Sequence, residues 1–366
     1  MRANILIEKE LDRLDFEPTV VIGFYPSSLQ EKFYSAYQKL TEKFPETTVI
    51  GCSSESNIYD TLPYIDVYRD SLCVFLCLDL KKEAFGVSVH STDEILYSEC
   101  YPPNQSALIL SARYSFELEQ SIDNLTHSMG KGEVFGAVAS HCVPQRISEA
   151  TVFFNGNFFK DRFIMLLIDR AFYGISGMST YHFQPVGFDL EVTEANGNTI
   201  YTIDNKPALQ LLEEMIGTRL ENTIASFNHP LFLTKSKYLS YTTPPLCSIM
   251  SIDRKTHSLT LFRKVSQQEK LKVGIALNRE KQDAQIEKFA SLSYENGVAL
   301  VFNSVGIERN LEMMEYIYLM DLKKHLNMPI AGFHSFCEIG PLSKEDTSVL
   351  HNQTITVISL YPKERG

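Results

Sequence analysis

The 366-residue sequence has no tryptophan, so its aromatic packing must come from 23 phenylalanines and 18 tyrosines. It is also poor in positive charge: 34 lysines and arginines against 45 acidic residues give a net charge of −11. Nucleic acids and anionic membrane surfaces attract proteins through clustered positive charge. The composition therefore argues against nucleic acid and membrane as partners.

Long apolar runs are missing as well. No stretch approaches the about 18 apolar residues of a membrane-spanning helix, and the apolar run in the opening MRANILIEKE is too short for a secretory signal. The seven cysteines are an odd number without a CxxC pair, which is typical of free thiols in a reducing compartment. We therefore expect a cytoplasmic protein that is neither exported nor anchored.

The common catalytic motifs are absent. The sequence contains no P-loop, GxGxxG, GxSxG or HExxH pattern, and no pair among its nine histidines has metal-ligand spacing. We predict no catalytic residue and no enzymatic activity. Catalytic triads can assemble from distant residues, so a hydrolase or transferase that uses Cys52 or Ser54 as nucleophile stays open as an alternative.

A unit of strand, helix, strand and glycine occurs three times. Apolar runs indicate buried strands, and apolar residues at every third or fourth position indicate helices. The units begin with the apolar runs 19–25, 107–110 and 298–302, and their returning strands carry Gly51, Gly136 and Gly332. The glycine follows the first strand by 27, 27 and 30 residues (24 to 51, 109 to 136 and 302 to 332). This register indicates one repeated unit with parallel strands.

Turn signals complete the fold prediction. Asn155-Gly156, Asn196-Gly197 and Arg254-Lys255 each separate two strand-like runs and predict hairpins. The segment 207–216 predicts a helix that begins at proline and ends before a glycine. We predict a mixed α/β protein of two fused domains, residues 15–222 and 223–360, each a mixed sheet flanked by helices.

The returning strands all end in small or polar residues. They read Gly51-Cys-Ser53-Ser54, Gly136-Ala-Val-Ala-Ser140 and Gly332-Phe-His334-Ser335. Ligands of open α/β sheets sit beyond the carboxyl ends of the strands, so the three turns predict a pocket. Glycine also permits close packing of a helix on a sheet, and this alternative stays open.

Several segments resemble the FIST family. The segment 329–341, PIAGFHSFCEIGP, and LHNQT at 350–354 resemble the end of the FIST C-terminal domain, whereas VIGCSS at 49–54 and VFGAVAS at 134–140 resemble segments of the FIST N-terminal domain. The ordered series covers residues 15 to 360. The sequence departs from the family pattern at Glu55, Ser56, Asn57, His334 and Cys337.

The resemblance implies a sensory protein of signal transduction. It implies binding of a small ligand, such as an amino acid or similar metabolite. The expected output partner is a separate histidine kinase of a two-component system or another signalling protein. One subgroup of the family resembles haem-binding nitric-oxide sensors, which makes haem a candidate cofactor.

We predict ligand-binding residues near the three turns. Glu338 can accept hydrogen bonds from an amine-bearing ligand, Arg113 can pair with an anionic group, and His351 begins the last strand. The alternatives are a solvated or capping role for Glu338, a surface ion pair for Arg113, and a strand-start role for His351 and Asn352. The full predicted set is Ser53, Ser54, Arg113, Ser335, Glu338, His351 and Asn352.

Two histidines lie among aromatic residues in the sequence. His182 follows Tyr181 and precedes Phe183, and His334 lies beside Phe333. A haem iron takes an axial histidine in an apolar cavity, so His182 and His334 are candidate axial ligands. An ordinary core histidine is the alternative for each.

Overall fold

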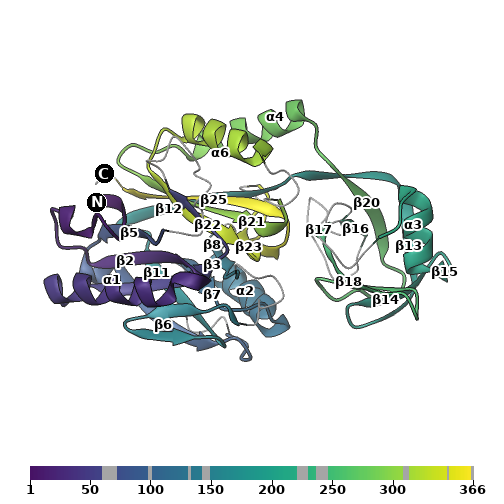
Figure 1. Ribbon diagram of the computed structural model, residues 1–366, viewed down its shortest axis with the longest axis horizontal. Helices are drawn as coiled ribbons and strands as arrows, with labels where there is room; N and C mark the ends of the chain where they lie inside the picture. Colours follow the sequence, from purple (N-terminus) through teal and green to yellow (C-terminus); the bar gives the residue numbers. More distant parts are fainter. Residues whose placement is uncertain are drawn as a thin grey trace.

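The computed structural model describes residues 1–59, 72–97, 101–130, 133–141, 149–220, 230–235, 246–307, 313–343 and 346–363. These residues form a larger lobe, where both termini lie, and a smaller lobe beside it (Figure 1). The described strands form four sheets, three of them in the larger lobe. The predicted mixed α/β fold is confirmed.

The first sheet carries the first unit. Its strands, in spatial order, are β1 (Arg2–Ile7), β5 (Val74–Asp79), β2 (Val20–Pro26), β3 (Thr48–Ser54), β9 (Val152–Phe154) and β10 (Asn157–Phe159). Helix α1 (Gln30–Lys43) joins β2 to β3. It buries Phe33, Ala36 and Leu40 against the sheet, as the helical spacing of apolar residues predicts.

The second sheet repeats this arrangement. Its strands are β24 (Val349–His351), β23 (Cys337–Gly340), β8 (Val134–Val138), β7 (Gln105–Ser111), β11 (Arg162–Asp169) and β6 (Phe85–Ser91). Helix α2 (Phe116–Met129) begins at Ser115, whose side chain accepts a hydrogen bond from the Leu118 amide. It packs on the outer face of this sheet through Leu118, Ile122 and Leu125.

The third sheet holds the third unit. Its strands are β12 (Tyr173–Tyr181), β25 (Thr354–Pro362), β21 (Val298–Ser304), β22 (Ile330–Ser335) and β4 (Asn57–Tyr59). Helices α4 (Arg279–Phe289) and α6 (Met313–Leu326) cover its outer face (Figure 1). The pairs β2–β3, β7–β8 and β21–β22 are all parallel, which confirms the repeated unit.

The glycine shared by the three units is needed for the approach of two strand backbones. A Cβ atom at Gly51, Gly136 or Gly332 would overlap the carbonyl oxygen of the residue paired with it in the parallel strand, Gly23, Ile109 or Val301. The close neighbour is therefore a strand and not a helix. Only glycine leaves room for that carbonyl.

The three sheets exchange strands in a closed cycle. The chain leaving the first unit forms β4, which pairs with β22 of the third sheet. The chain leaving the third unit forms β23, which pairs with β8 of the second sheet. The chain beyond the second unit forms β9, which pairs with β3 of the first sheet. The inner faces of all three sheets share one apolar core.

The smaller lobe is inserted between β12 and β21. It contains β13 (Phe183–Asn196), β14 (Thr199–Ile203), β15 (Lys206–Pro207), α3 (Ala208–Ile216), β16 (Leu231–Lys235), β17 (Leu246–Cys247), β18 (Ile249–Asp253), β19 (Ser258–Leu261) and β20 (Lys270–Ala276). All three predicted hairpins are confirmed: β9–β10, β13–β14 and β18–β19. Helix α3 is also confirmed, and it ends at Gly217 in the left-handed conformation.

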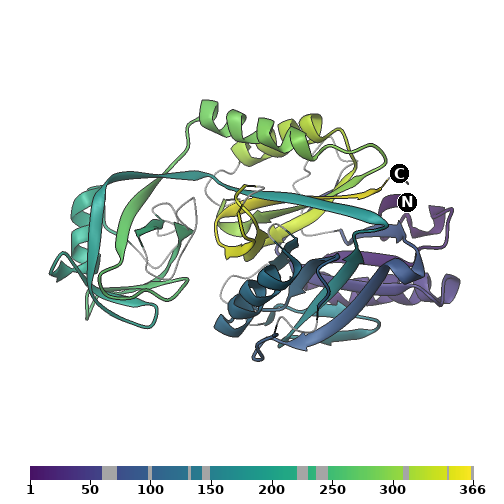
Figure 2. The same cartoon turned by 180° about the vertical axis from the view of Figure 1, so that it is seen from behind.

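Two chain segments connect the lobes. The teal strand β12 runs into β13 at His182, and β20 returns to α4 (Figure 1, Figure 2). The amide of Leu277 donates a hydrogen bond to the carbonyl of His182 at 2.8 Å, so the two connections are joined. The predicted domain boundary at residue 222 lies outside the described residues, and the bounds 15–222 and 223–360 stay predictions.

Candidate functional site

The ends of the three returning strands meet in the larger lobe, as the sequence predicts. Ser53 and Ser140 exchange two hydrogen bonds: Ser53 Oγ donates to the Ser140 carbonyl at 3.0 Å, and the Ser140 amide donates to the Ser53 carbonyl at 3.2 Å. Ser140 Oγ donates to the carbonyl of His334. The His334 amide donates to the Ser56 carbonyl at 2.9 Å. We call Ser53, Ser56, Ser140, His334 and Ser335 the strand-end cluster; all five are buried.

Glu338 is fully buried beside the strand-end cluster. Its Oε1 accepts a hydrogen bond from Ser335 Oγ at 2.6 Å, and its Oε2 accepts from Thr354 Oγ1 at 2.7 Å and from the Thr354 amide at 3.2 Å. Burial raises the Glu338 pKa to about 8, against the lowering effect of these hydrogen bonds. The predicted solvated-loop alternative is wrong for this residue. A carboxyl group that is protonated near neutral pH can lose its proton and become charged when a positively charged group approaches.

The segment His351–Gln353 connects this region to the smaller lobe. His351 Nε2 donates to the Gly340 carbonyl at 2.9 Å, so its Nδ1 accepts from the Tyr181 hydroxyl at 2.9 Å. Asn352 hydrogen bonds Ser248 of the smaller lobe through its Oδ1, and Gln353 Nε2 donates to the same hydroxyl at 2.7 Å. The chain that presents Thr354 to Glu338 is therefore tied to Ser248.

Arg113 and Ser54 lie outside this hydrogen-bond network. Arg113 forms an ion pair with Asp93 and a bond from Nε to Thr92 Oγ1 at 2.8 Å, and 42% of its side chain is exposed. The structure therefore agrees with the alternative role of Arg113, a surface ion pair. Ser54 is buried, and its hydroxyl donates to Asn57 Oδ1 at 2.6 Å.

The sequence reasoning did not select three important residues. Ser140 ends its strand as Ser54 and Ser335 end theirs, and Thr354 closes the LHNQT segment, so both had a visible signal. Ser248 follows Cys247 in a short strand region and shows no pattern that separates it from other serines. Its role depends on how the smaller lobe meets the larger one.

His182 is a buried histidine that packs on an aromatic ring. Neither ring nitrogen has a hydrogen-bond partner among the residues that the structure describes, and burial lowers its pKa to about 3. Its ring packs on Tyr318 of α6 with the centroids 4.6 Å apart. The Tyr318 hydroxyl also lacks a partner within the described chain. Among the described residues, packing alone holds the side chain.

Neither candidate histidine fits a haem as arranged. The His182 nitrogens have the required chemistry, but the Tyr318 ring covers the imidazole where a porphyrin would need a flat slot. His334 Nδ1 is 2.7 Å from Ser56 Oγ and lies where the three units pack together. Within the described ranges, no group of three His, Cys, Asp or Glu residues is placed to hold a metal ion.

Replacing His182 by phenylalanine is expected to stabilise the protein by about 1–3 kcal/mol, the cost of a buried polar group left unpaired. Phenylalanine keeps the ring contact with Tyr318 and carries no nitrogen to desolvate. Urea unfolding at neutral pH measures the difference.

His351→Phe is the matched control for that substitution. It removes the hydrogen bond from the Tyr181 hydroxyl to Nδ1 and the one from Nε2 to the Gly340 carbonyl, and should destabilise by roughly 1–3 kcal/mol for each. Equal losses in both variants would contradict the view that His182 has no polar partner.

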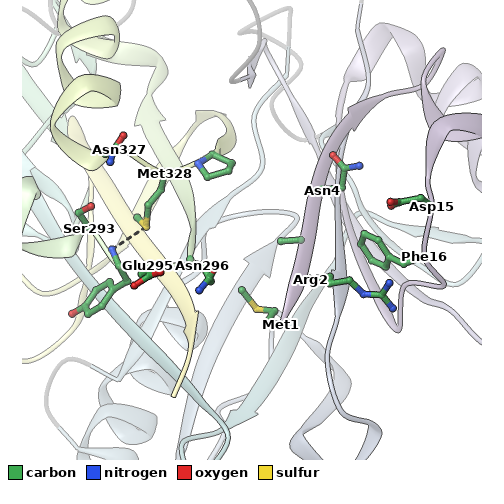
Figure 3. Close-up of a pocket in the computed structure, with 14 residues that line it drawn as sticks. Met1, Arg2, Asn4, Asp15, Phe16, Ser293, Glu295, Asn296, Asn327 and Met328 are labelled. Atoms are coloured by element: carbon green, nitrogen blue, oxygen red, sulfur yellow. Dashed lines mark hydrogen bonds between the residues drawn. The ribbon is translucent and has the colours of Figure 1, made fainter. Parts of the chain in front are cut away.

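A cavity of about 640 Å³ lies away from these residues. Figure 3 shows Asn327 and Met328 on one wall and Asn4, Asp15 and Phe16 on the other. It is at the amino ends of β21 and β22, whereas the strand-end cluster is at their carboxyl ends. No predicted site residue lines it. Several of its polar side chains face solvent, so we place the candidate site at Glu338.

Two family models match the chain. Residues 19–206 match the FIST N domain and residues 208–341 match the FIST C domain. No curated protein matches the sequence. The two matches meet between β15 and α3, inside the smaller lobe. FIST domains are sensory domains of signal transduction that bind small ligands.

Proposed function

Because the chain belongs to the FIST family, we propose that it is a cytoplasmic sensory protein that binds a small amine-bearing metabolite at Glu338. An amino acid or a similar compound has the required ammonium group. The proposed output is a change in a separate signalling partner, such as a histidine kinase. No helix of the described chain is long and apolar enough to cross a membrane.

The buried carboxyl group of Glu338 carries this proposal. A buried carboxylate is costly, and the raised pKa shows that the hydrogen bonds and the neighbouring His334 offset that cost only in part. An ammonium group of a ligand would supply a further positive charge and make charge-assisted hydrogen bonds. Titratable groups perturbed in this way are concentrated at functional sites.

The neighbours of Glu338 suggest how binding could be transmitted. We propose that Ser53, Ser54 and Ser335 contact the ligand with Glu338. His351 and Asn352 would hold the segment that carries Thr354, and Ser248 would transmit its displacement to the smaller lobe. Arg113 is left out of the proposed site, since Asp93 already pairs with it.

The arrangement gives less support to an enzyme. Burial raises the pKa of the Cys52 thiol well above its ordinary value, which keeps it protonated and weakly nucleophilic. The Ser54 hydroxyl donates to an amide oxygen, which is not a general base. Neither alternative nucleophile is activated by the residues that the structure places around it.

Amine-bearing metabolites are expected to raise the thermal stability of the wild-type protein. A ligand at 100 times its Kd adds about 2.7 kcal/mol. Binding to Glu338 should ionise the carboxyl group, so it should release a proton at neutral pH and tighten as pH rises towards 8. Thermal-shift screening finds the ligand, and calorimetry in buffers of different ionisation enthalpy counts the protons.

Glu338→Gln should abolish both the shift and the proton release while the protein stays folded. Glu280→Gln, on the exposed side of α4, is the matched control and should bind like the wild type. A shift that survives Glu338→Gln would place the site elsewhere. A protein that no amine-bearing metabolite stabilises would contradict the proposed ligand class.

A further inference from the structure

Of the strands that the structure describes, β6 is an edge strand of the second sheet, at the lower margin of the larger lobe (Figure 1). Its residues Phe85–Ser91 pair with β11 in an unbroken register, from Phe85 opposite Ile168 to Ser91 opposite Arg162. Among the described strands, none pairs with its other edge. Neighbouring residues of a strand turn their backbone N–H and C=O groups to opposite edges, so the donors and acceptors of alternate residues face outward along about 23 Å.

The other sheet edges in the larger lobe are short, charged or buried. Strands β10, β24 and β4 have three residues each, and β1 begins with the exposed Arg2. Strand β12 is long, but most of it is buried, and the Ser179 amide donates to the Pro341 carbonyl at 2.7 Å. Soluble proteins protect exposed edges by such means.

Strand β6 has none of these protections. Its sequence FGVSVHS contains no charged residue and no proline, and its pairing with β11 has no bulge. Every residue in it is half-buried, and Phe85, Val87 and Val89 pack against the edge of the central core. An edge of this kind is a template for another strand.

We propose that β6 pairs antiparallel with β6 of a second copy of this chain, about a two-fold axis at Ser88. The strand is complementary to itself in this register. Val87 of one copy lies opposite Val89 of the other, which joins their apolar faces. Gly86 lies opposite His90, and no atom lies within 4 Å of the position of a Cβ at Gly86, which leaves space for the imidazole.

The self-complementary register of β6 favours a second copy as the partner, and the lack of charge in the strand permits it. The chain has a net charge of −11, so most of its surface would repel another copy. In β6 the register brings no like charges opposite each other, because the strand has none. Pairing would join two six-stranded sheets into one continuous sheet and cover the edge of both cores.

A charge placed at Ser88 tests this register, because Ser88 of one chain lies opposite Ser88 of the second chain. The wild type is expected to sediment at twice the 41.6 kDa of one chain. Ser88→Lys alone and Ser88→Glu alone should each become single chains, since like charges are then opposed at the axis. An equimolar mixture of the two variants should regain the double mass, since opposite charges then meet.

Ser35→Lys, on the exposed face of α1, is the control for added charge and should keep the double mass. Circular dichroism should show each Ser88 variant folded like the wild type. A wild type that sediments as a single chain at every concentration would overturn the proposal. So would double mass retained by folded Ser88→Lys, or a variant mixture that stays at the mass of one chain.

Discussion

Glu338→Gln is expected to remove a contribution that lowers the stability of the wild type as pH rises from 4.5 to 8. The folded-state pKa of Glu338 is about 8, and its ordinary value is 4.5, so the folded protein holds a proton that the unfolded chain has lost. The stability that this proton contributes is complete below pH 4.5 and disappears as pH rises to 8. At 1.36 kcal/mol for each pH unit, the loss reaches up to about 5 kcal/mol.

Two buried histidines impose the opposite slope at lower pH. The pKa values of His182 and His351 are lowered to about 3 from 6.5, so stability falls as pH drops from 6.5 towards 3. The wild type should therefore be most stable near pH 6.5. Urea unfolding at intervals from pH 4.5 to 8 should show a decline above 6.5 in the wild type and none from this source in Glu338→Gln. Parallel profiles would contradict the assignment.

Gly332→Ala is expected to destabilise the protein by about 3 kcal/mol or more, at the upper end of single substitutions. The new Cβ would overlap the Val301 carbonyl oxygen, so β22 would have to shift away from β21. That shift would also disturb β4, which pairs with β22 on its other side. Urea unfolding with circular dichroism measures the difference.

The matched control for Gly332→Ala is Gly86→Ala in β6, with both changes made in the Ser88→Lys variant so that the proposed pairing of β6 does not contribute. A Cβ at Gly86 meets no atom within 4 Å, and the change should stay within about 0.5 kcal/mol. If Gly332→Ala were as stable as Gly86→Ala, the close approach of the parallel strands would not be the reason for the shared glycine.

Local patterns were enough to predict the repeated unit, the three hairpins and helix α3. Each unit of two parallel strands and the chain between them lies within fewer than forty residues, and the hairpins at Asn155 and Asn196 depend on two-residue turns. The cycle of exchanged strands could not be predicted in this way. Strands β4, β9 and β23 have three or four residues each, and their partners are set by tertiary packing.

The candidate site was predictable where it depended on strand ends. Ser335 and Glu338 were selected, and the structure brings them into contact. Arg113 follows its strand in the same way, but a surface pairing with Asp93 decides its position. For His182 the sequence suggested Tyr181 and Phe183 as the surroundings. Neighbours on a strand point to opposite faces, and the ring contact is with Tyr318 from a distant helix.

The exchange of strands among the three sheets has a consequence for synthesis on the ribosome. The first sheet can close as soon as β9 emerges, but β8 stays uncovered until residues 337–340 are made. The third sheet has no central strands before residue 298. A nascent chain must therefore hold apolar sheet faces and an unpaired strand edge open until these later strands are made. Incomplete chains of this kind are prone to aggregate, so the demand for chaperones should be greatest just before residues 298–340 appear.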